Sequence, residues 1–151
     1  SPHALWNGTE DTNQLQDIEI PSVLRSGHVL VAEDSRTALT ALTQIFKNAK
    51  MPMLMFSNGK KLIDYIEGLA DISTINAIVT DIEMPEMSGF TVIQRLRANP
   101  VTAHLPVIVN SSMTGNNNKR EAEVLGADNF VDKTKSHNII PMIVDAIKAK
   151  V

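Results

Sequence analysis

The chain has 151 residues, of which 43% are hydrophobic and 21% charged, and this composition excludes disorder over the whole length. A net charge of −3 lacks the basic footprint of a nucleic-acid-binding protein, so we expect no nucleic-acid partner. The absence of cysteine excludes disulfide scaffolds, cysteine-ligated zinc and a thiol nucleophile. No apolar run approaches the roughly 18 residues of a membrane span, so we expect no membrane insertion.

Residues 1–26 differ from the rest of the chain. They are largely polar and show no sustained period of 2 or 3.6 residues, which is typical of a linker or tail that is poorly ordered. The remaining residues, 27–151, are numerous enough to bury one core, so we expect a single folded domain there.

From Gly27 onward, short apolar runs alternate with segments whose apolar residues recur at helical spacing. The runs predict strands over residues 29–32, 53–56, 77–80, 107–110 and 129–131. The helical spacing predicts helices over residues 35–49, 62–69 and 90–96, a fourth from after Asn118 to about Leu125, and a fifth over 139–147. Gly126 is suited to cap the fourth helix, and Pro141 falls in the first turn of the last. Strict alternation of this kind predicts a parallel sheet with helices on both faces.

Polar side chains follow most of the predicted strands directly. The first strand is followed by Glu33 and Asp34, the third by Asp81, the fourth by Ser111 and Ser112, and the fifth by Lys133. Ligand sites in open parallel sheets lie beyond the carboxyl ends of the strands, so we expect these groups to converge on one edge.

The chemistry of this set favours phosphoryl transfer. Three carboxylates in one place repel one another, and a hard cation such as Mg²⁺ removes that repulsion. A carboxylate can attack phosphorus and form an aspartyl phosphate, while Lys133 neutralises the phosphoryl oxygens and a serine hydroxyl donates to one of them. For Asp34 or Ser35 alone, a helix N-cap is the better interpretation, because acidic and hydroxyl side chains are favoured there in any case.

Three segments resemble the receiver domain of two-component response regulators. They are residues 30–35 (LVAEDS), 79–89 (VTDIEMPEMSG) and 126–133 (GADNFVDK). The resemblance covers about residues 27–151 and implies a doubly wound α/β fold of the flavodoxin-like (βα)5 type, with a five-stranded parallel sheet of strand order 2-1-3-4-5. It also implies a cytoplasmic signalling protein that receives a phosphoryl group from a sensor histidine kinase.

The resemblance assigns a role to each candidate site residue. It makes Asp81 the phosphoacceptor and Mg²⁺ the cofactor, and it implies no enzymatic activity beyond the chain's own phosphorylation and dephosphorylation. The implied metal ligands are Asp34, Asp81, the backbone carbonyl of Glu83 and, through water, Glu33. The implied switch residues are the hydroxyl of Ser111 and the aromatic ring of Phe130, with Lys133 on the phosphoryl oxygens.

Residues 110–118 (NSSMTGNNN) resemble a loop of chemotaxis coupling proteins of the CheV type. That resemblance implies a chemotaxis kinase as partner and an N-terminal coupling domain in the same parent chain. The chain starts with Ser1 rather than Met, which fits an excised C-terminal domain.

Two positions depart from the common receiver pattern. Thr134 follows Lys133 where most receivers have proline, so we expect a trans peptide bond there. Glu83 stands where many receivers have an uncharged residue, and it could bind the metal, orient water or point outward. Two other functions stay open: a Mg²⁺-dependent phosphatase of small phosphoesters with an aspartyl-phosphate intermediate, and an interaction module that is never phosphorylated.

Overall fold

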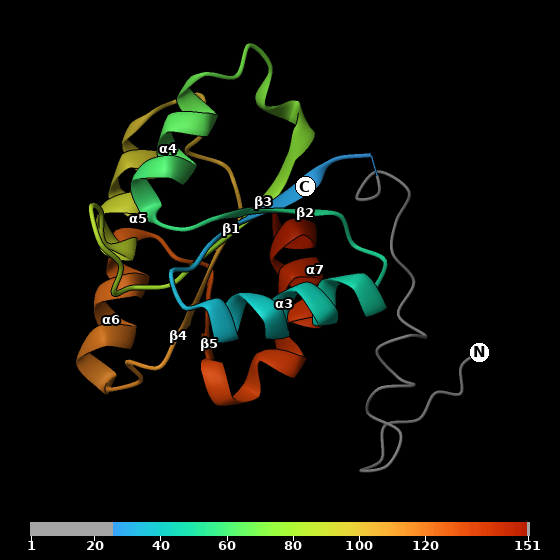
Figure 1. The fold of residues 1–151 in the computed structure, drawn as a ribbon. Helices are drawn as coiled ribbons and strands as arrows, with labels where there is room; N and C mark the ends of the chain where they lie inside the picture. The colour runs from blue at the N-terminus through green and yellow to red at the C-terminus, as the bar shows by residue number, and fades with distance from the viewer. Residues whose placement is uncertain (1–25, 151) are drawn as a thin grey trace.

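The structure is a computed structural model that describes residues 26–150 (Figure 1). Five parallel strands form one sheet in the order β2-β1-β3-β4-β5, as the resemblance implied. The strands are β1 (His28–Ala32), β2 (Met53–Phe56), β3 (Ile75–Thr80), β4 (Val107–Ser111) and β5 (Asn129–Asp132). All but residue 26 of the predicted tail over residues 1–26 lies outside the described residues.

Helices cover both faces of the sheet (Figure 1). They are α3 (Arg36–Asn48), α4 (Gly59–Glu67), α5 (Gly89–Ala98), α6 (Asn116–Leu125) and α7 (Ile139–Ala149). Figure 1 shows α3 and α7 on one face and α4, α5 and α6 on the other. Two 3₁₀ helices, η1 (Ile72–Thr74) and η2 (Lys133–Asn138), precede β3 and α7.

The strands are apolar on both sides because both faces of the sheet are covered. In β1, Val29 and Val31 belong to the core under α3 and α7, while Leu30 and Ala32 belong to the core under α4 and α5. Side chains alternate between the faces of a strand, so a strand buried on both faces is a continuous apolar run rather than an alternating one.

Two helices begin earlier than the sequence pattern predicted. The α4 helix starts at Gly59, because the side chain of Asn58 caps it by accepting a hydrogen bond from the backbone N–H of Lys61 at 2.9 Å. The α6 helix starts at Asn116 rather than after Asn118. Asparagine is a poor helix former because its side chain competes for backbone hydrogen bonds. In the first turn the backbone N–H groups have no partner within the helix, so asparagine costs little stability there.

Two of the helices, α4 and α6, end at a glycine. The α4 helix ends at Glu67 with Gly68 as its C-cap, so Leu69 lies outside the helix in which the spacing placed it. Gly126 caps α6 with a φ of 114°, in the left-handed region that glycine adopts readily, as predicted.

A polar corner joins the starts of β4 and β5. The guanidinium of Arg97 donates to the carbonyls of Leu105 at 2.7 Å and Gly126 at 3.0 Å, and to Asp128 Oδ2 at 3.1 Å. Asp128 Oδ2 also accepts the backbone N–H of Val107 at 2.8 Å. These contacts fix the two strands relative to each other at their amino ends, opposite the edge formed by the carboxyl ends of the strands.

Candidate functional site

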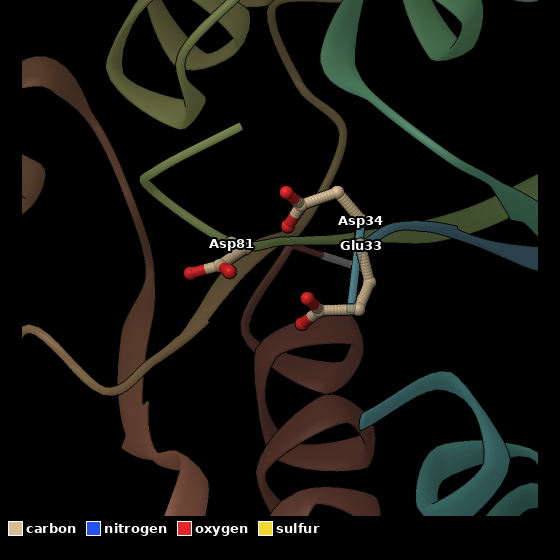
Figure 2. A group of neighbouring side chains, drawn as sticks. All are labelled: Glu33, Asp34 and Asp81. Atoms are coloured by element: carbon tan, nitrogen blue, oxygen red, sulfur yellow. The ribbon is translucent and has the colours of Figure 1, made fainter. Parts of the chain in front are cut away.

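The carboxyl ends of β1 and β3 bring three acids together. Glu33 and Asp34 follow Ala32 and Asp81 follows Thr80, and the sheet register pairs Ala32 with Thr80. Carboxylate oxygens of the three acids all lie within 4.8 Å of one another. Figure 2 shows the three carboxylates turned toward a common space at this edge, where the sequence predicted that they would converge.

The three acids differ in their exposure to solvent. Asp34 is exposed, whereas Glu33 is 1% and Asp81 5% exposed. Burial raises the pKa of Glu33 above its ordinary value of 4.5, and the nearby charge of Asp81 acts in the same direction. The backbone N–H of Ser35, which donates to Glu33 Oε2 at 3.0 Å, opposes the rise.

Lys133 pairs with two of these acids. It follows the last residue of β5, and its Nζ lies 2.8 Å from Asp81 Oδ2 and 3.0 Å from Glu33 Oε1. Burial alone would lower the pKa of Lys133, but the hydrogen bonds and charges of Asp81 and Glu33 outweigh that effect and hold the pKa above its ordinary 10.5. The ammonium therefore stays charged at neutral pH and offsets part of the repulsion between the acids.

The loop after β3 holds Asp81 in place. The backbone N–H of Ile82 donates to Asp81 Oδ1 at 2.7 Å, and Gly89 N–H donates to Ile82 O at 2.7 Å. A Cβ atom at Gly89 would lie 1.9 Å from the carbonyl oxygen of Asp81, a distance that no side chain permits. This close approach explains why the motif that starts at Asp81 ends in glycine.

Ser111 ends β4 at the same edge of the sheet. It is fully buried, it pairs in register with Asp132, and its Oγ accepts the backbone N–H of Met113 at 3.0 Å. Because that bond uses a lone pair, the hydroxyl proton is not committed to it. The hydroxyl therefore keeps a proton that it can donate at the carboxyl end of β4.

Phe130 lies in β5 with its ring partly buried. The Nζ of Lys119, in the first half of α6, lies 5.9 Å from the ring centroid, a distance at which a cation and an aromatic face attract. The ring thus packs against the core under α4 and α5 and also faces the cation of Lys119.

Glu83 and Thr134 are the two residues that depart from the common receiver pattern. The Glu83 side chain is exposed, and its carboxylate is not part of the acidic cluster found within residues 26–150. No cis peptide bond occurs in the described part of the chain, so the bond after Lys133 is trans, as expected. The backbone N–H and the hydroxyl of Thr134 both donate to Asp132 Oδ1 at 2.8 Å, and these bonds turn the chain after Lys133.

The donor set fits a hard divalent cation. Glu33, Asp34 and Asp81 offer oxygen donors only, and one ammonium, that of Lys133, is too little positive charge to balance three carboxylates. Oxygen ligands with a few carboxylates are what Mg²⁺ takes in proteins. The residues that could hold it are therefore Glu33, Asp34 and Asp81.

A partly buried polar bridge lies beside the site and was not predicted from the sequence. Ser136 Oγ lies 3.1 Å from Asn110 Oδ1 and 3.0 Å from the carbonyl oxygen of Lys133. Asn110 is 1% exposed. The sequence did contain an indication of this bridge, because Asn110 is a polar residue at the end of the otherwise apolar run of residues 107–110.

The chain matches a known protein family and is similar in sequence to two chemotaxis proteins. The sequence model of the family described as "Response regulator receiver domain" matches residues 29–145. Chemotaxis protein CheV2 of Helicobacter pylori is 40% identical over 115 residues, which is 76% of this chain and 37% of that protein. Chemotaxis protein CheV1 of the same organism is 39% identical over 125 residues, which is 82% of this chain and 39% of that protein. The chain therefore spans less than two fifths of the length of these relatives.

Solved structures show the same fold. The receiver domain of the Francisella response regulator 1452 has a TM-score of 0.72 and 24% identity, covering 83% of this chain and 99% of that one. Vibrio cholerae chemotaxis protein CheY4 has a TM-score of 0.68 and 17% identity, covering 80% of this chain and 98% of that one.

Among residues 26–150, none of the helices has the length and apolar character needed to cross a bilayer.

Proposed function

The chain belongs to the response regulator receiver family, and from this premise we propose that it is a phosphorylation-controlled switch in a chemotaxis pathway. Asp81 accepts a phosphoryl group from a sensor histidine kinase, with Mg²⁺ as cofactor. The observation that carries the proposal is the convergence of Glu33, Asp34, Asp81 and Lys133 at one edge of the sheet. The similarity to CheV1 and CheV2 supports chemotaxis as the pathway.

Phosphoryl transfer requires only one nucleophile from the chain. A carboxylate oxygen of Asp81 attacks the phosphorus atom, the phosphorus–nitrogen bond of the phosphohistidine donor breaks, and its electron pair remains on the imidazole nitrogen. The Ile82 N–H orients the carboxylate through Oδ1, and burial of the side chain limits water at the reaction centre. Lys133 contacts the phosphoryl oxygens in place of its present carboxylate partners.

Metal binding falls to the three acids of the cluster and one backbone carbonyl. Glu33, Asp34, Asp81 and the backbone carbonyl of Glu83 would hold Mg²⁺, Glu33 through a water molecule. Bound Mg²⁺ supplies positive charge that offsets the repulsion between the carboxylates and the phosphoryl oxygens.

The conformational switch uses two residues, Ser111 and Phe130. The Ser111 hydroxyl donates to a phosphoryl oxygen on Asp81, and the ring of Phe130 moves inward behind it. Phosphorylation adds charge-assisted contacts with Ser111 and Lys133 in one of two conformations and so shifts the equilibrium toward it. The surface that reports the shift is formed by α6, β5 and α7, with Lys119 at its rim.

The partners follow from the relatives. A chemotaxis histidine kinase donates the phosphoryl group in the cytoplasm, and a coupling domain precedes this receiver in the parent chain. The whole protein's role includes that coupling domain, because the chain matches less than two fifths of CheV1 and CheV2.

Transfer from a kinase tests this function. A purified chemotaxis histidine kinase, phosphorylated with γ-³²P-labelled ATP and freed of nucleotide, is mixed with the chain and Mg²⁺. We expect label to leave the kinase within seconds to minutes and to enter the wild type but not Asp81→Asn. Label in Asp81→Asn, or none in the wild type while a known receiver in the same assay is labelled, would overturn the proposal.

A further inference from the structure

Asn110 is a polar residue in a strand whose other interior positions are apolar. It lies in β4 between Val109 and Ser111 and is 1% exposed. Its Nδ2 is buried and has no hydrogen-bond partner among residues 26–150. An unpaired buried donor destabilises a fold, and a valine at this position would fill the space without one. The amide therefore needs an explanation other than stability.

The amide oxygen makes one contact. Ser136 Oγ lies 3.1 Å from Asn110 Oδ1 and 3.0 Å from the carbonyl oxygen of Lys133, and its single proton is shared between these two oxygens in a three-centre hydrogen bond. Asn110 is paired in register with Val131 of β5, which lies two residues before Lys133, the first residue of η2. Ser136 is thus the link between the end of β4 and the backbone of Lys133.

The segment that carries Lys133 has little regular backbone structure of its own. It is the short 3₁₀ helix η2, and Lys135 interrupts it with φ −120° and ψ 26°, outside the helical range. Short 3₁₀ segments have poor hydrogen-bond geometry, so side-chain contacts decide where they lie. Ser136 and Asn110 supply such a contact on the inner side, next to the sheet.

The position of Lys133 matters because its side chain is long and flexible. Lys133 follows β5, an edge strand of the sheet. From there its Nζ must come within 2.8 Å of Asp81 and 3.0 Å of Glu33. A backbone that is held in place limits the positions that the ammonium can take. Less conformational entropy is therefore lost when the ammonium contacts the two acids. We propose that Asn110 and Ser136 form a clamp that positions Lys133 against Asp81 for phosphoryl transfer. Neither residue touches a reacting atom, so both are positioning residues, and the proposal rests on the proposed function.

The test uses the full chain, acetyl phosphate as donor and saturating Mg²⁺, with phosphorylation followed by intact mass. Asn110→Val and Ser136→Ala are the test variants, and Ser136→Thr is the conservative variant that keeps the hydroxyl. Thr102→Val is the matched control, because it removes a buried hydroxyl that donates to the carbonyl of Leu96 at 2.8 Å without any contact to Lys133.

We expect Asn110→Val and Ser136→Ala to lower the maximal phosphorylation rate about tenfold, since a small misplacement of a group near the reacting atoms has effects of this size or larger. Across a Mg²⁺ titration, the concentration for half-maximal rate should not rise, because a displaced Lys133 ammonium leaves all three acids that would hold the metal in place. Ser136→Thr and Thr102→Val should keep the wild-type rate. In a Lys133→Ala background, Ser136→Ala should cause no further loss.

Each contrary outcome has its own meaning. A wild-type rate in Asn110→Val and Ser136→Ala, or an undiminished effect of Ser136→Ala in the Lys133→Ala background, would overturn the clamp and leave the proposed function intact. If the wild type takes no phosphoryl group, the proposed function fails, and urea unfolding decides the clamp. In that case Lys133→Met is made in the wild type and in Ser136→Ala, and the shift that it causes in the urea unfolding midpoint is compared. A smaller shift in Ser136→Ala supports the clamp, and an equal shift overturns it.

Discussion

The ammonium of Lys133 lies 2.8 Å from Oδ2 of Asp81, although 52 positions separate the two residues in the chain. The two residues follow β5 and β3, which are separated in the sheet by β4. The same ammonium contacts Glu33, so a single cation joins acids from two strand ends.

Removing the Lys133 cation should destabilise the metal-free protein. Lys133→Met leaves Asp81 and Glu33, which are almost fully buried, without a counter-charge. We expect a loss of about 3 kcal/mol, at the low end for a broken buried ion pair, because 20% of the Lys133 side chain is exposed. Urea unfolding with a chelator present measures it, and a loss below about 1 kcal/mol would contradict the assigned role of the ion pair.

The raised pKa of Glu33 should appear in the pH dependence of stability. The folded protein holds this proton more tightly than the unfolded chain, so the stabilising contribution is complete below pH 4.5 and is lost as pH rises through the raised pKa. In chelator, the wild type should therefore lose stability relative to Glu33→Gln over that range. Urea unfolding at a series of pH values tests this, and a difference that does not vary with pH would show that Glu33 is not perturbed.

Asp34 and Glu83 should differ in their effect on metal binding. The Asp34 carboxylate belongs to the acidic cluster, whereas that of Glu83 does not. We expect Asp34→Asn to weaken Mg²⁺ binding by at least about tenfold, because it removes a charged oxygen ligand. Glu83→Gln, which keeps the backbone carbonyl, serves as the matched control and should change the affinity less than about threefold. Isothermal titration calorimetry decides between them, and equal effects of the two variants would refute the ligand assignment.

The close approach of Gly89 to Asp81 should make that glycine irreplaceable. In Gly89→Ala the new Cβ would meet the Asp81 carbonyl oxygen at 1.9 Å, so the loop must move. We expect a loss of about 3 kcal/mol in unfolding free energy, together with impaired phosphorylation. Gly68→Ala is the control, since its Cβ would lie 3.4 Å from its nearest neighbour, and it should change stability by less than about 0.5 kcal/mol. Comparable losses in both variants would contradict this account of the motif.

The fold and the acidic cluster were predictable because they depend on patterns that the sequence displays. Alternating strand and helix segments predict a parallel sheet, and in such a sheet Glu33, Asp34 and Asp81 must share an edge whatever the details of packing. The approach of Lys133 to the same edge follows for the same reason. The sheet order and the trans bond after Lys133 are confirmed, whereas the catalytic and metal-binding roles stay predictions.

The features that were missed depend on contacts between distant side chains. Arg97 lies on an amphipathic helix, where the pattern suggests only a solvated charge, yet it joins the starts of β4 and β5 through Asp128. Ser136 follows Lys133 closely in sequence, but its contact with Asn110 depends on how η2 packs on β4. The early start of α6 was missed because helix propensity says little about the first turn, and Gly115, the residue before α6, has no side chain that could mark the start as a cap.

The central claim is that Asp81 is the phosphoacceptor of a functional receiver, and intact mass spectrometry tests it most directly. The chain is incubated with acetyl phosphate, with Mg²⁺ or with chelator, and Asp81→Asn is treated in parallel. The account predicts the gain of one phosphoryl group by the wild type with Mg²⁺ alone, and no gain in chelator or in Asp81→Asn. No gain by folded, metal-bound wild type, or an equal gain by Asp81→Asn, would contradict it.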